Sequence, residues 1–473
     1  MHRSSRMPNV AFSVVFALSA GGVRAQQPVA VGPAGRTNVV LIMTDDQGAW
    51  SLGCYGNPEA RTPTLDRLAA EGVRLTQAFA TTPVCSPSRA TFLTGRVPSQ
   101  HGIHDWIKHE NMGPRARYCL RPDEVTLSEV LARHGYVCGL TGKWHLGDSL
   151  HPHAGFTYWF AMPQGSSRYQ DAEMIWDGKL VETTGYITDR ITDRAIEFLD
   201  AHRDRPFFLS VQYNAPHTPY EGHPKDMLDL YADSPFASIP RLPVHPWASA
   251  DFGNIGRRES LQRYFAACSG VDRAVGRILA QLDKLDLAGR TLVVYTSDQG
   301  FNVGHHGLWG KGNASNPRNM YDTSLRVPMI FRHAGMLPKG RTLDDMVSAY
   351  DFVPTILDYV GLPPSPGRNL PGRSIAPALR GEAMPARDAI FGEYGHARMI
   401  RTREWKYVHR ANGGPHELYD LKNDPDETKN LVDAPEHRAL RMRLRTELLT
   451  WFSDYGEAGA DPVGQEYLRP EGR

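Results

Sequence analysis

Continuous apolar runs recur along the chain and predict strands that are buried on both faces. Residues 37–43 read T-N-V-V-L-I-M, residues 206–212 contain F-F-L-S-V, and residues 290–296 form a third run. Such runs are typical of strands in a parallel sheet that helices cover on both sides. Apolar residues at helical spacing predict helices over residues 62–72, 126–134, 186–202, 258–285 and 350–359.

A Pro- and Gly-rich stretch divides the chain toward its C-terminal end. Residues 363–373 read P-P-S-P-G-R-N-L-P-G-R, a composition that marks a boundary. Beyond it, residues 397–410 and 417–420 predict strands of a small antiparallel sheet, and residues 435–452 predict a closing helix. The expected organisation is a main domain and a C-terminal subdomain, over residues 37–370 and 371–473.

Two long stretches of the main domain stand out: residues 148–185 have weak periodicity, typical of an insertion that faces a ligand or of loosely packed surface, and residues 220–256 are predicted to be mostly irregular. Residues 148–185 are rich in Gly, His and aromatic residues, and residues 220–256 are rich in Pro. Connections of this length are uncommon unless they serve binding. We expect the first stretch to be an insertion that faces the ligand, and the second to form the rim of the pocket.

The first 25 residues have the layout of a signal peptide. Two arginines precede an apolar core over residues 10–20, and V-R-A ends the segment. The core is too short to span a bilayer as a stable helix, and no Cys follows that could carry a lipid. We expect removal of residues 1–25, a flexible lead-in over 26–36, and export to the periplasm or the medium.

The charge balance gives no support for a nucleic-acid partner or a membrane surface. The chain of 473 residues has 53 basic and 52 acidic side chains. Residues 1–25 hold three arginines and no acid, so 50 basic and 52 acidic side chains remain after their removal. The mature protein would have a net charge near −2, with neither a surplus of basic residues nor a polybasic run. With 41% hydrophobic residues, the chain can bury a large core.

Residues 85–96, C-S-P-S-R-A-T-F-L-T-G-R, predict a short helix that begins at Cys85 and is closed by Gly95. Pro87 in its first turn costs no hydrogen bond, and its fixed φ suits a helix start. Cys85 would therefore lie among unpaired N–H groups at the positive end of the helix dipole, where anions bind. Arg89, one turn further on, can point toward the same place.

Two of the predicted buried strands end in carboxylates. Asp45 and Asp46 follow the first run, and Asp298 follows the third. Buried carboxylates are costly unless a cation neutralises them, and ligands of open α/β sheets bind at the carboxyl ends of the strands. Three carboxylates with hard oxygen donors favour a divalent cation such as Ca²⁺ or Mg²⁺.

Basic side chains follow other predicted strands. The segment G-K-W-H-L-G at 142–147 places Lys143 and His145 on one face if it is extended. The segment N-A-P-H-T-P contains His217, and Gly310 is followed by Lys311. Each of these residues alone is more often solvated or structural than catalytic, so their meaning depends on the other motifs.

Together these motifs resemble the type I sulfatase family, which is formylglycine-dependent, arylsulfatase-like and part of the alkaline phosphatase superfamily. Its signature is C-x-P-S-R followed by A-x-x-x-T-G-R, and the similarity covers most of residues 36–430. The resemblance implies an α/β fold with a large, mostly parallel or mixed sheet flanked by helices, and a smaller C-terminal antiparallel sheet plus helix. It also implies that a maturation enzyme oxidises Cys85 to formylglycine (3-oxoalanine).

The resemblance further assigns a metal and a set of site residues. It implies Ca²⁺, in preference to Mg²⁺, held by Asp45, Asp46, Asp298, Gln299 and the oxidised residue 85. The family commonly has Asn or His at position 299, but the amide oxygen of Gln can also serve calcium. The catalytic set that it implies is Cys85, Arg89, Lys143, His145, His217 and Lys311.

The mechanism that the resemblance implies starts with attack of the hydrated formylglycine on sulfur, with Asp298 as the base. The leaving alcohol takes a proton from His217 or Lys311. His145 then removes a proton from the second hydroxyl, so that the aldehyde reforms and inorganic sulfate leaves.

Two other functions compete with sulfate ester hydrolysis: hydrolysis of a phosphonate or phosphate ester, and carbohydrate binding without catalysis. A phosphonate or phosphate ester hydrolase of the same superfamily could share the nucleophile and the metal ligands. A carbohydrate-binding relative without catalysis would have lost the catalytic residues, which are all present here. The expected substrate is a sulfated carbohydrate or an aryl sulfate; neither its identity nor the oligomeric state follows from the residues.

Four further polar residues are candidates for supporting roles. His101 and His104 could face the pocket or could satisfy loop backbone, and the pattern does not decide between them. His306 and Asp322 are expected to support the pocket.

Conversion of Cys85 would leave four cysteines that could pair in an exported protein. A bridge between Cys119 and Cys138 is one such pairing. No C-x-x-C occurs, so a thiolate zinc site is not expected. The four remaining cysteines are Cys54, Cys119, Cys138 and Cys268.

Overall fold

A computed structural model describes residues 36–108, 117–249, 251–363, 369–411, 413–462 and 464. The predicted signal peptide, residues 1–25, lies outside the described residues, as does the lead-in up to residue 35. No helix in the described part of the chain is long and apolar enough to cross a membrane.

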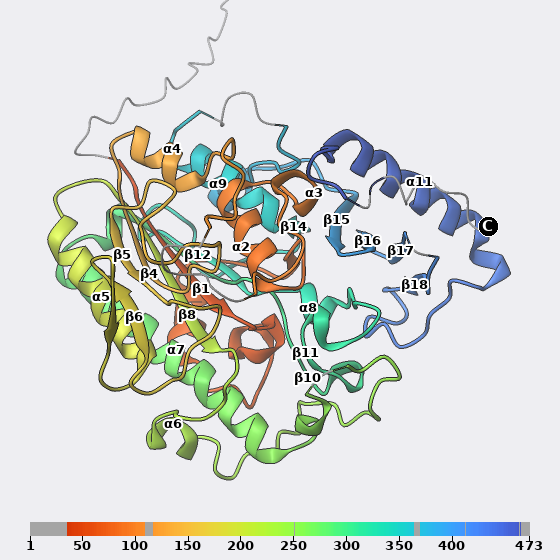
Figure 1. Cartoon of the computed structure of the whole chain (residues 1–473), viewed down its shortest axis with the longest axis horizontal. Helices are drawn as coiled ribbons and strands as arrows, with labels where there is room; N and C mark the ends of the chain where they lie inside the picture. Colours follow the sequence, from red (N-terminus) through yellow and green to blue (C-terminus); the bar gives the residue numbers. More distant parts are fainter. Residues whose placement is uncertain are drawn as a thin grey trace, which may run out of the picture.

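The main body of the molecule contains a ten-stranded sheet with the strand order β13-β2-β12-β9-β1-β8-β4-β5-β6-β7. Figure 1 labels its central strands, among them β12, β1, β8 and β4. At its centre, β1 (Asn38–Asp45) pairs in parallel with β8 (Phe207–Pro216) on one side and β9 (Thr291–Ser297) on the other. Next to β8 lies β4 (Val137–Gly142), which is also parallel. Every residue of these four strands is buried, as their apolar runs predict.

Beyond β9, the sheet contains antiparallel as well as parallel pairs of strands. There β12 (Met329–Arg332) lies antiparallel to both β9 and β2 (Val73–Leu75), and β13 (Arg341–Leu343) lies parallel to β2. The chain after β2 forms a separate short strand, β3 (Ala78–Phe79), before the helix of Cys85.

The opposite edge is built from the predicted insertion. It contains β5 (Tyr158–Ala161), parallel to β4, followed by the antiparallel strands β6 (Glu173–Trp176) and β7 (Lys179–Glu182). The weak periodicity of this stretch did not reveal the three short strands that extend the sheet. Gln164, Gly165 and Ser166, between β5 and β6, line a cavity.

Helices cover both faces of the sheet, as Figure 1 shows. Val39, Leu41 and Met43 of β1 share one core with the first group of helices, and Val40 and Ile42 share another core with the second group. Successive side chains of a strand point to opposite faces, which explains the unbroken apolar run. The first group is α2 (Cys85–Thr94), α4 (Leu127–Arg133) and α9 (Phe352–Tyr359); the second is α1 (Pro63–Ala70), α5 (Ile187–His202) and α7 (Arg258–Lys284).

A smaller antiparallel sheet follows in the C-terminal part, drawn in blue in Figure 1. Leu444, Leu448 and Phe452 of the closing helix pack on this sheet and are buried. The predicted α/β fold with a small C-terminal sheet and helix is confirmed, whereas the domain boundary at residue 370 stays a prediction. The elements are β15 (Ala389–Tyr394), β16 (Ala397–Thr402), β17 (Trp405–Arg410), β18 (Glu417–Asp420) and α11 (Arg438–Tyr455).

The remaining elements are short. Residues 220–256 form one brief helix and a 3-10 turn in otherwise irregular chain, with residue 250 outside the description. The short elements are α3 (Pro98–His101), α6 (Lys225–Asp229), α8 (Asp322–Leu325), α10 (Ala376–Arg380), β10 (Asn302–Val303), β11 (Trp309–Gly310) and β14 (Val347–Ser348).

All five cysteines are free in the structure. The sulfur of Cys138 lies 3.4 Å from the carbonyl of Ser128, and that of Cys119 lies 3.4 Å from the carbonyl of Arg117. The two thiols therefore face different parts of the backbone, and the considered Cys119–Cys138 bridge is absent.

A buried ion-pair network joins the C-terminal sheet to α8. Lys406 on β17 is fully buried, and its Nζ lies 2.5 Å from carboxylate oxygens of both Glu427 and Asp322. Asp322 also pairs with Arg401 on β16, at 2.8 Å. Asp322 was expected to support the catalytic pocket, but its charge is instead used to attach the C-terminal sheet to α8.

We expect Lys406→Met to lower the free energy of unfolding by about 3–5 kcal/mol, because two buried carboxylates lose their shared partner. Urea denaturation measures this. Lys422→Met is the matched control, since Lys422 pairs with Glu404 at the surface and both side chains are more than half exposed; it should change stability by less than about 0.5 kcal/mol. Equal stability of the two variants would contradict a structural role for the network.

Candidate active site

Three carboxylates meet where β1 and β9 end side by side. The side chains of Asp45, Asp46 and Asp298 are all at most 3% exposed. The backbone N–H of Asp298 donates to the Thr44 carbonyl at 3.1 Å, and that of Asp46 donates to Asp298 Oδ1 at 3.3 Å. Parallel pairing of the two strands thus brings together acids that are about 250 residues apart in sequence.

Each carboxylate has its own cation, supplied by a different segment of the chain. Arg89 on α2 contacts Asp298 Oδ2 through Nε at 2.9 Å and Nη2 at 2.8 Å. Lys143, just after β4, donates to Asp45. Lys311, just after β11, lies 2.7 Å from Asp46 Oδ1. The three positive charges therefore balance the three negative ones.

Gln212 on β8 holds the arginine in place and was not identified from the sequence. Its Oε1 accepts from Arg89 Nη1 at 2.8 Å, and the same nitrogen donates to the Lys143 carbonyl at 3.2 Å. A polar residue that ends the apolar run F-F-L-S-V was the available signal.

The surroundings move the pKa values of the two strand-end acids in opposite directions. Burial acts to raise the pKa of Asp45, but Lys143 and the other nearby positive groups outweigh it and hold this pKa well below its usual value. Burial and the neighbouring charge of Asp45 raise the pKa of Asp298 well above its usual value, although Arg89 opposes the change. Asp298 is therefore the better proton acceptor of the two.

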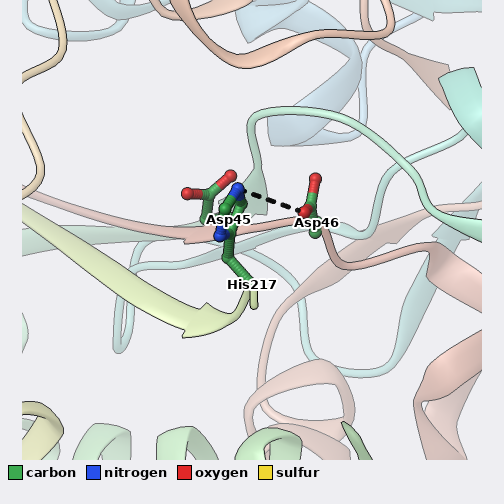
Figure 2. A group of neighbouring side chains, drawn as sticks. All are labelled: Asp45, Asp46 and His217. Carbon is green, nitrogen blue, oxygen red and sulfur yellow. Dashed lines mark ion pairs between the residues drawn. The ribbon is translucent and has the colours of Figure 1, made fainter. Parts of the chain in front are cut away.

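A group suited to a metal ion lies at the same place. One ligand atom each from Asp45, Asp46 and His217 lies within 4.8 Å of the other two, as Figure 2 shows for the side chains. Gln299 donates through Nε2 to Asp46 at 2.6 Å, while its buried Oε1 has no hydrogen-bond partner within the described ranges. Two carboxylates and an unused amide oxygen fit a hard divalent cation.

The other predicted ligands are arranged differently. Asp298 and Cys85 are outside the compact group of Asp45, Asp46 and His217. Both oxygens of Asp298 already accept hydrogen bonds, Oδ2 from Arg89 and Oδ1 from the N–H groups of Asp46 and Gln299. The sequence also did not predict that the imidazole of His217 would come this close to the acids.

Four of the six predicted catalytic residues line one cavity of about 480 Å³. Cys85, only 4% exposed at the start of α2, shares this cavity with His145, His217 and Lys311. Arg89 and Lys143 lie behind it and contact the carboxylates. The remaining lining residues, which the sequence did not single out, are Trp106, Ile107, Gln164, Gly165, Ser166 and Asn313.

The loop after β5 approaches His145 closely. A Cβ atom on Gly165 would lie 2.3 Å from His145 Nε2, so this position has no room for a side chain while the ring stays in place. On its other side, His145 Nε2 lies 3.0 Å from the Ile107 carbonyl. The glycine therefore allows the loop and the ring to form one wall of the cavity.

The three histidines that were considered for supporting roles, His101, His104 and His306, do not line this cavity. His101 is buried between Thr91 and the backbone of Ile103, so the structural alternative is correct for it. His104 lies 2.5 Å from the Ala460 carbonyl and lines a second cavity. His306 stacks on Tyr321 with a ring separation of 3.7 Å.

A family model described as Sulfatase matches residues 37–362, well over half of the chain. The chain belongs to the sulfatase family. A second model, described as the C-terminal part of N-sulphoglucosamine sulphohydrolase, matches residues 304–453. This sulfatase is therefore an enzyme of the expected class, and its family supports hydrolysis of sulfate esters.

Relatives with known names support the same class. This sulfatase is 28% identical to the N-acetylglucosamine-6-O-sulfatase of Bacteroides thetaiotaomicron, over 86% of this chain and 85% of that protein. It is 30% identical to the ulvan-active sulfatase of Formosa agariphila, over 89% and 82%. A solved structure in complex with its substrate D-glucosamine-2-N,6-O-disulfate matches with a TM-score of 0.77 at 25% identity, covering 90% of this chain and 99% of that one. The alkaline-phosphatase-like fold is thus confirmed.

The acidic group yields a test that does not depend on catalysis. We expect Ca²⁺ to raise the melting temperature of the protein after treatment with a chelator, because an ion that binds only the folded state stabilises it. Gln299→Leu should weaken the apparent calcium affinity about tenfold, a loss of about 1.4 kcal/mol. Differential scanning fluorimetry over a calcium titration measures both effects.

Gln262→Leu is the matched control, since Gln262 lies on α7 and donates to the Leu228 carbonyl, away from the acids. Its calcium response should equal that of the unmodified protein. A melting temperature that ignores calcium, or an unchanged response in Gln299→Leu, would contradict the cation site; a stronger response to Mg²⁺ would replace the expected ion.

Proposed function

We propose that this sulfatase hydrolyses a sulfate ester of a carbohydrate and releases inorganic sulfate, with residue 85 as the nucleophile after oxidation of Cys85 to formylglycine. The observation that carries the proposal is the convergence of Cys85, His145, His217 and Lys311 on one cavity. Residue 85 lies at the start of α2, where free N–H groups favour an anionic ligand.

Hydrated formylglycine supplies two hydroxyl groups on one carbon, one to attack sulfur and one that lets the aldehyde reform. A thiol offers no second hydroxyl, so it could form a bond to sulfur but could not complete the turnover in this way. Asp298, whose pKa is raised by burial and by Asp45, is the proposed acceptor for the proton of the attacking group.

The charges of the site suit a sulfate ester. Arg89, Lys143 and Lys311 balance the three carboxylates, so a bound divalent cation leaves the site with a surplus of about two positive charges. We propose Ca²⁺, held by Asp45, Asp46 and Gln299 with Asp298 beside them. The positive groups would orient the ester and offset the charge that develops on the transferred group.

His145 has the properties of a base for the second half of the reaction. A carbonyl only accepts hydrogen bonds, so the contact with Ile107 assigns the proton to Nε2 and leaves Nδ1 as the basic atom. Nδ1 is buried and has no partner in the described part of the chain. Burial, helped by Lys143, holds the pKa of His145 well below its usual value, so the ring is neutral at pH 7 and Nδ1 carries no proton.

Two groups are placed to give a proton to the leaving alcohol. His217 contacts the Thr218 carbonyl through Nδ1 at 2.6 Å, which leaves Nε2 toward the acids, 3.7 Å from Asp46. Nε2 carries a proton only in the imidazolium form; burial lowers the pKa of His217, and the charges of Asp45 and Asp46 oppose that change. Lys311 lines the same cavity. Both donors remain in the proposal: Lys311 Nζ lies 2.7 Å from Asp46 Oδ1, and His217 approaches the other oxygen of the same carboxylate.

The proposed substrate class follows from the lining and the relatives. Gln164, Ser166 and Asn313 contribute amide and hydroxyl groups that can bind the hydroxyls of a sugar. Two of the relatives are named for sulfated sugars or ulvan, and the matching solved structure holds a sulfated glucosamine.

We also propose that the protein is exported. We further propose that Cys85 is oxidised to formylglycine before the chain folds. At 4% exposure, the Cys85 side chain is out of reach of a maturation enzyme in the folded protein. The segment that such an enzyme would read, C-S-P-S-R, is buried together with it at the start of α2.

The decisive measurement is the mass of the tryptic peptide 75–89 from protein produced together with a maturation enzyme. We expect the formylglycine mass at position 85, and loss of turnover in Cys85→Ser and Cys85→Ala. Active protein with an unmodified Cys85 would contradict the nucleophile. Matched 4-nitrophenyl sulfate and phosphate esters test the bond: faster release from the phosphate would favour the rival phosphoryl hydrolase.

His145→Ala should separate the two halves of the reaction. With matured enzyme, we expect a burst of about one equivalent of 4-nitrophenol from 4-nitrophenyl sulfate, followed by turnover at least tenfold slower than that of the unmodified protein, because proton removal in the second half is impaired. Stopped-flow absorbance measures the burst. His151→Ala, at an imidazole that is 61% exposed, is the control and should show linear product release; the same linear trace in His145→Ala would refute the assignment.

A further inference from the structure

A second cavity, of about 570 Å³, adjoins the catalytic one. Asp105 lines the second cavity and its neighbour Trp106 lines the first. In the same way, Asn316 lines the second cavity and Asn313 the first. Ser249, which lines the second, donates to the carbonyl of Asn313 at 3.4 Å. Two stretches of chain therefore form walls of both cavities.

Arg318 is the charged residue of this second cavity whose hydrogen-bond donors are mostly unused. Its side chain is 38% exposed, and its guanidinium lies over the ring of Tyr394 at 5.1 Å. Its one polar side-chain contact in the described structure is a long one, 3.4 Å from Nη2 to Asp105 Oδ2. A guanidinium has five N–H donors, so most of the donors of Arg318 remain available to a ligand.

The other ionisable groups of the cavity are already engaged. Asp105 Oδ1 accepts from the Tyr394 hydroxyl at 2.7 Å and from the Trp106 N–H at 2.8 Å. Arg410 is buried and pairs with Glu417 at 2.5 Å. The Arg318–Asp105 pair itself is long and partly exposed, and such pairs contribute little. An anionic ligand could therefore compete for Arg318.

We propose that the second cavity binds the sugar next to the one that carries the scissile sulfate, and that Arg318 pairs with an acidic substituent of that sugar. This inference rests on the proposed function, because it places the sulfated sugar in the catalytic cavity. Both cavities have sizes usual for small-ligand sites. The substituent is a carboxylate or a sulfate, since both present the paired anionic oxygens that a planar guanidinium binds.

The experiment compares four substrates that carry the same scissile sulfate. They are the sulfated monosaccharide, its disaccharide with a neutral second sugar, the disaccharide with a uronic acid, and the disaccharide with a second sulfate. Steady-state sulfate release is measured for matured, calcium-loaded enzyme and for Arg318→Ala and Arg318→Lys. Arg403→Ala is the matched control, since Arg403 is 51% exposed and pairs with Asp344 instead.

We expect Arg318→Ala to raise KM about tenfold for an acidic disaccharide, with kcat unchanged, and to change the monosaccharide and the neutral disaccharide less than twofold. Arg318→Lys should keep the preference for acid in part, because a lysine provides charge without the planar pairing. The uronic acid and second-sulfate substrates show which acid the cavity prefers. Calorimetry with the desulfated acidic disaccharide should show the same tenfold loss in affinity.

Other results would overturn the inference in recognisable ways. Equal effects of Arg318→Ala on all four substrates, or none on the acidic ones, would remove Arg318 from substrate recognition. Equal kcat/KM values for the monosaccharide and all three disaccharides would remove the second cavity as a sugar site. In both cases sulfate release by the unmodified enzyme would leave the proposed function intact. Absence of sulfate release from every substrate, in protein with formylglycine at position 85, would instead refute the proposed function and this inference with it.

Discussion

The neutralisation of three buried carboxylates is the constraint on which the rest of the structure depends. Asp45, Asp46 and Asp298 are at most 3% exposed at the ends of two adjacent central strands. Taking such charges out of water costs several kcal/mol each unless cations accompany them. The positive charge comes from Arg89, Lys143 and Lys311, which lie in different parts of the chain. The elements that carry these three residues are therefore held around the carboxyl ends of the central strands.

The same requirement explains the position of residue 85, the proposed nucleophile. Arg89 lies one turn after Cys85 on α2, and its guanidinium is held by Asp298, by Gln212 and by the carbonyl of Lys143. The hydroxyl of Ser88 donates to the carbonyl of Asp298. These contacts fix the start of the helix over the strand ends, so residue 85 faces the cavity and is still within reach of the charged groups.

The proposed chemistry and the proposed substrate selectivity lie in different parts of the molecule. The charged centre lies at the ends of buried parallel strands, where ligands of open α/β sheets bind. The second cavity lies instead between loops of the main domain and β15–β17, at residues such as Asp105, Arg318 and Tyr394. Loops accept substitution more readily than buried strands do, so one catalytic centre can serve substrates that differ outside the scissile group.

Local patterns were sufficient where each residue's role depends on its neighbours in sequence. The unbroken apolar run of β1, the helix that begins at Cys85, and the acids that follow two buried strands all come from contiguous residues, and the family resemblance named the basic residues around them. The tertiary structure alone decided which strand ends meet, because β1 pairs with β9 across some 250 residues.

The tertiary structure also made strands within residues 158–182. Pairing at the edge of the sheet supplies their hydrogen bonds, and the weak hydrophobic periodicity of the sequence does not reveal that pairing. Finally, the tertiary structure placed Gln212 against Arg89 and kept His101 out of the pocket, because the direction of a side chain depends on what packs against it.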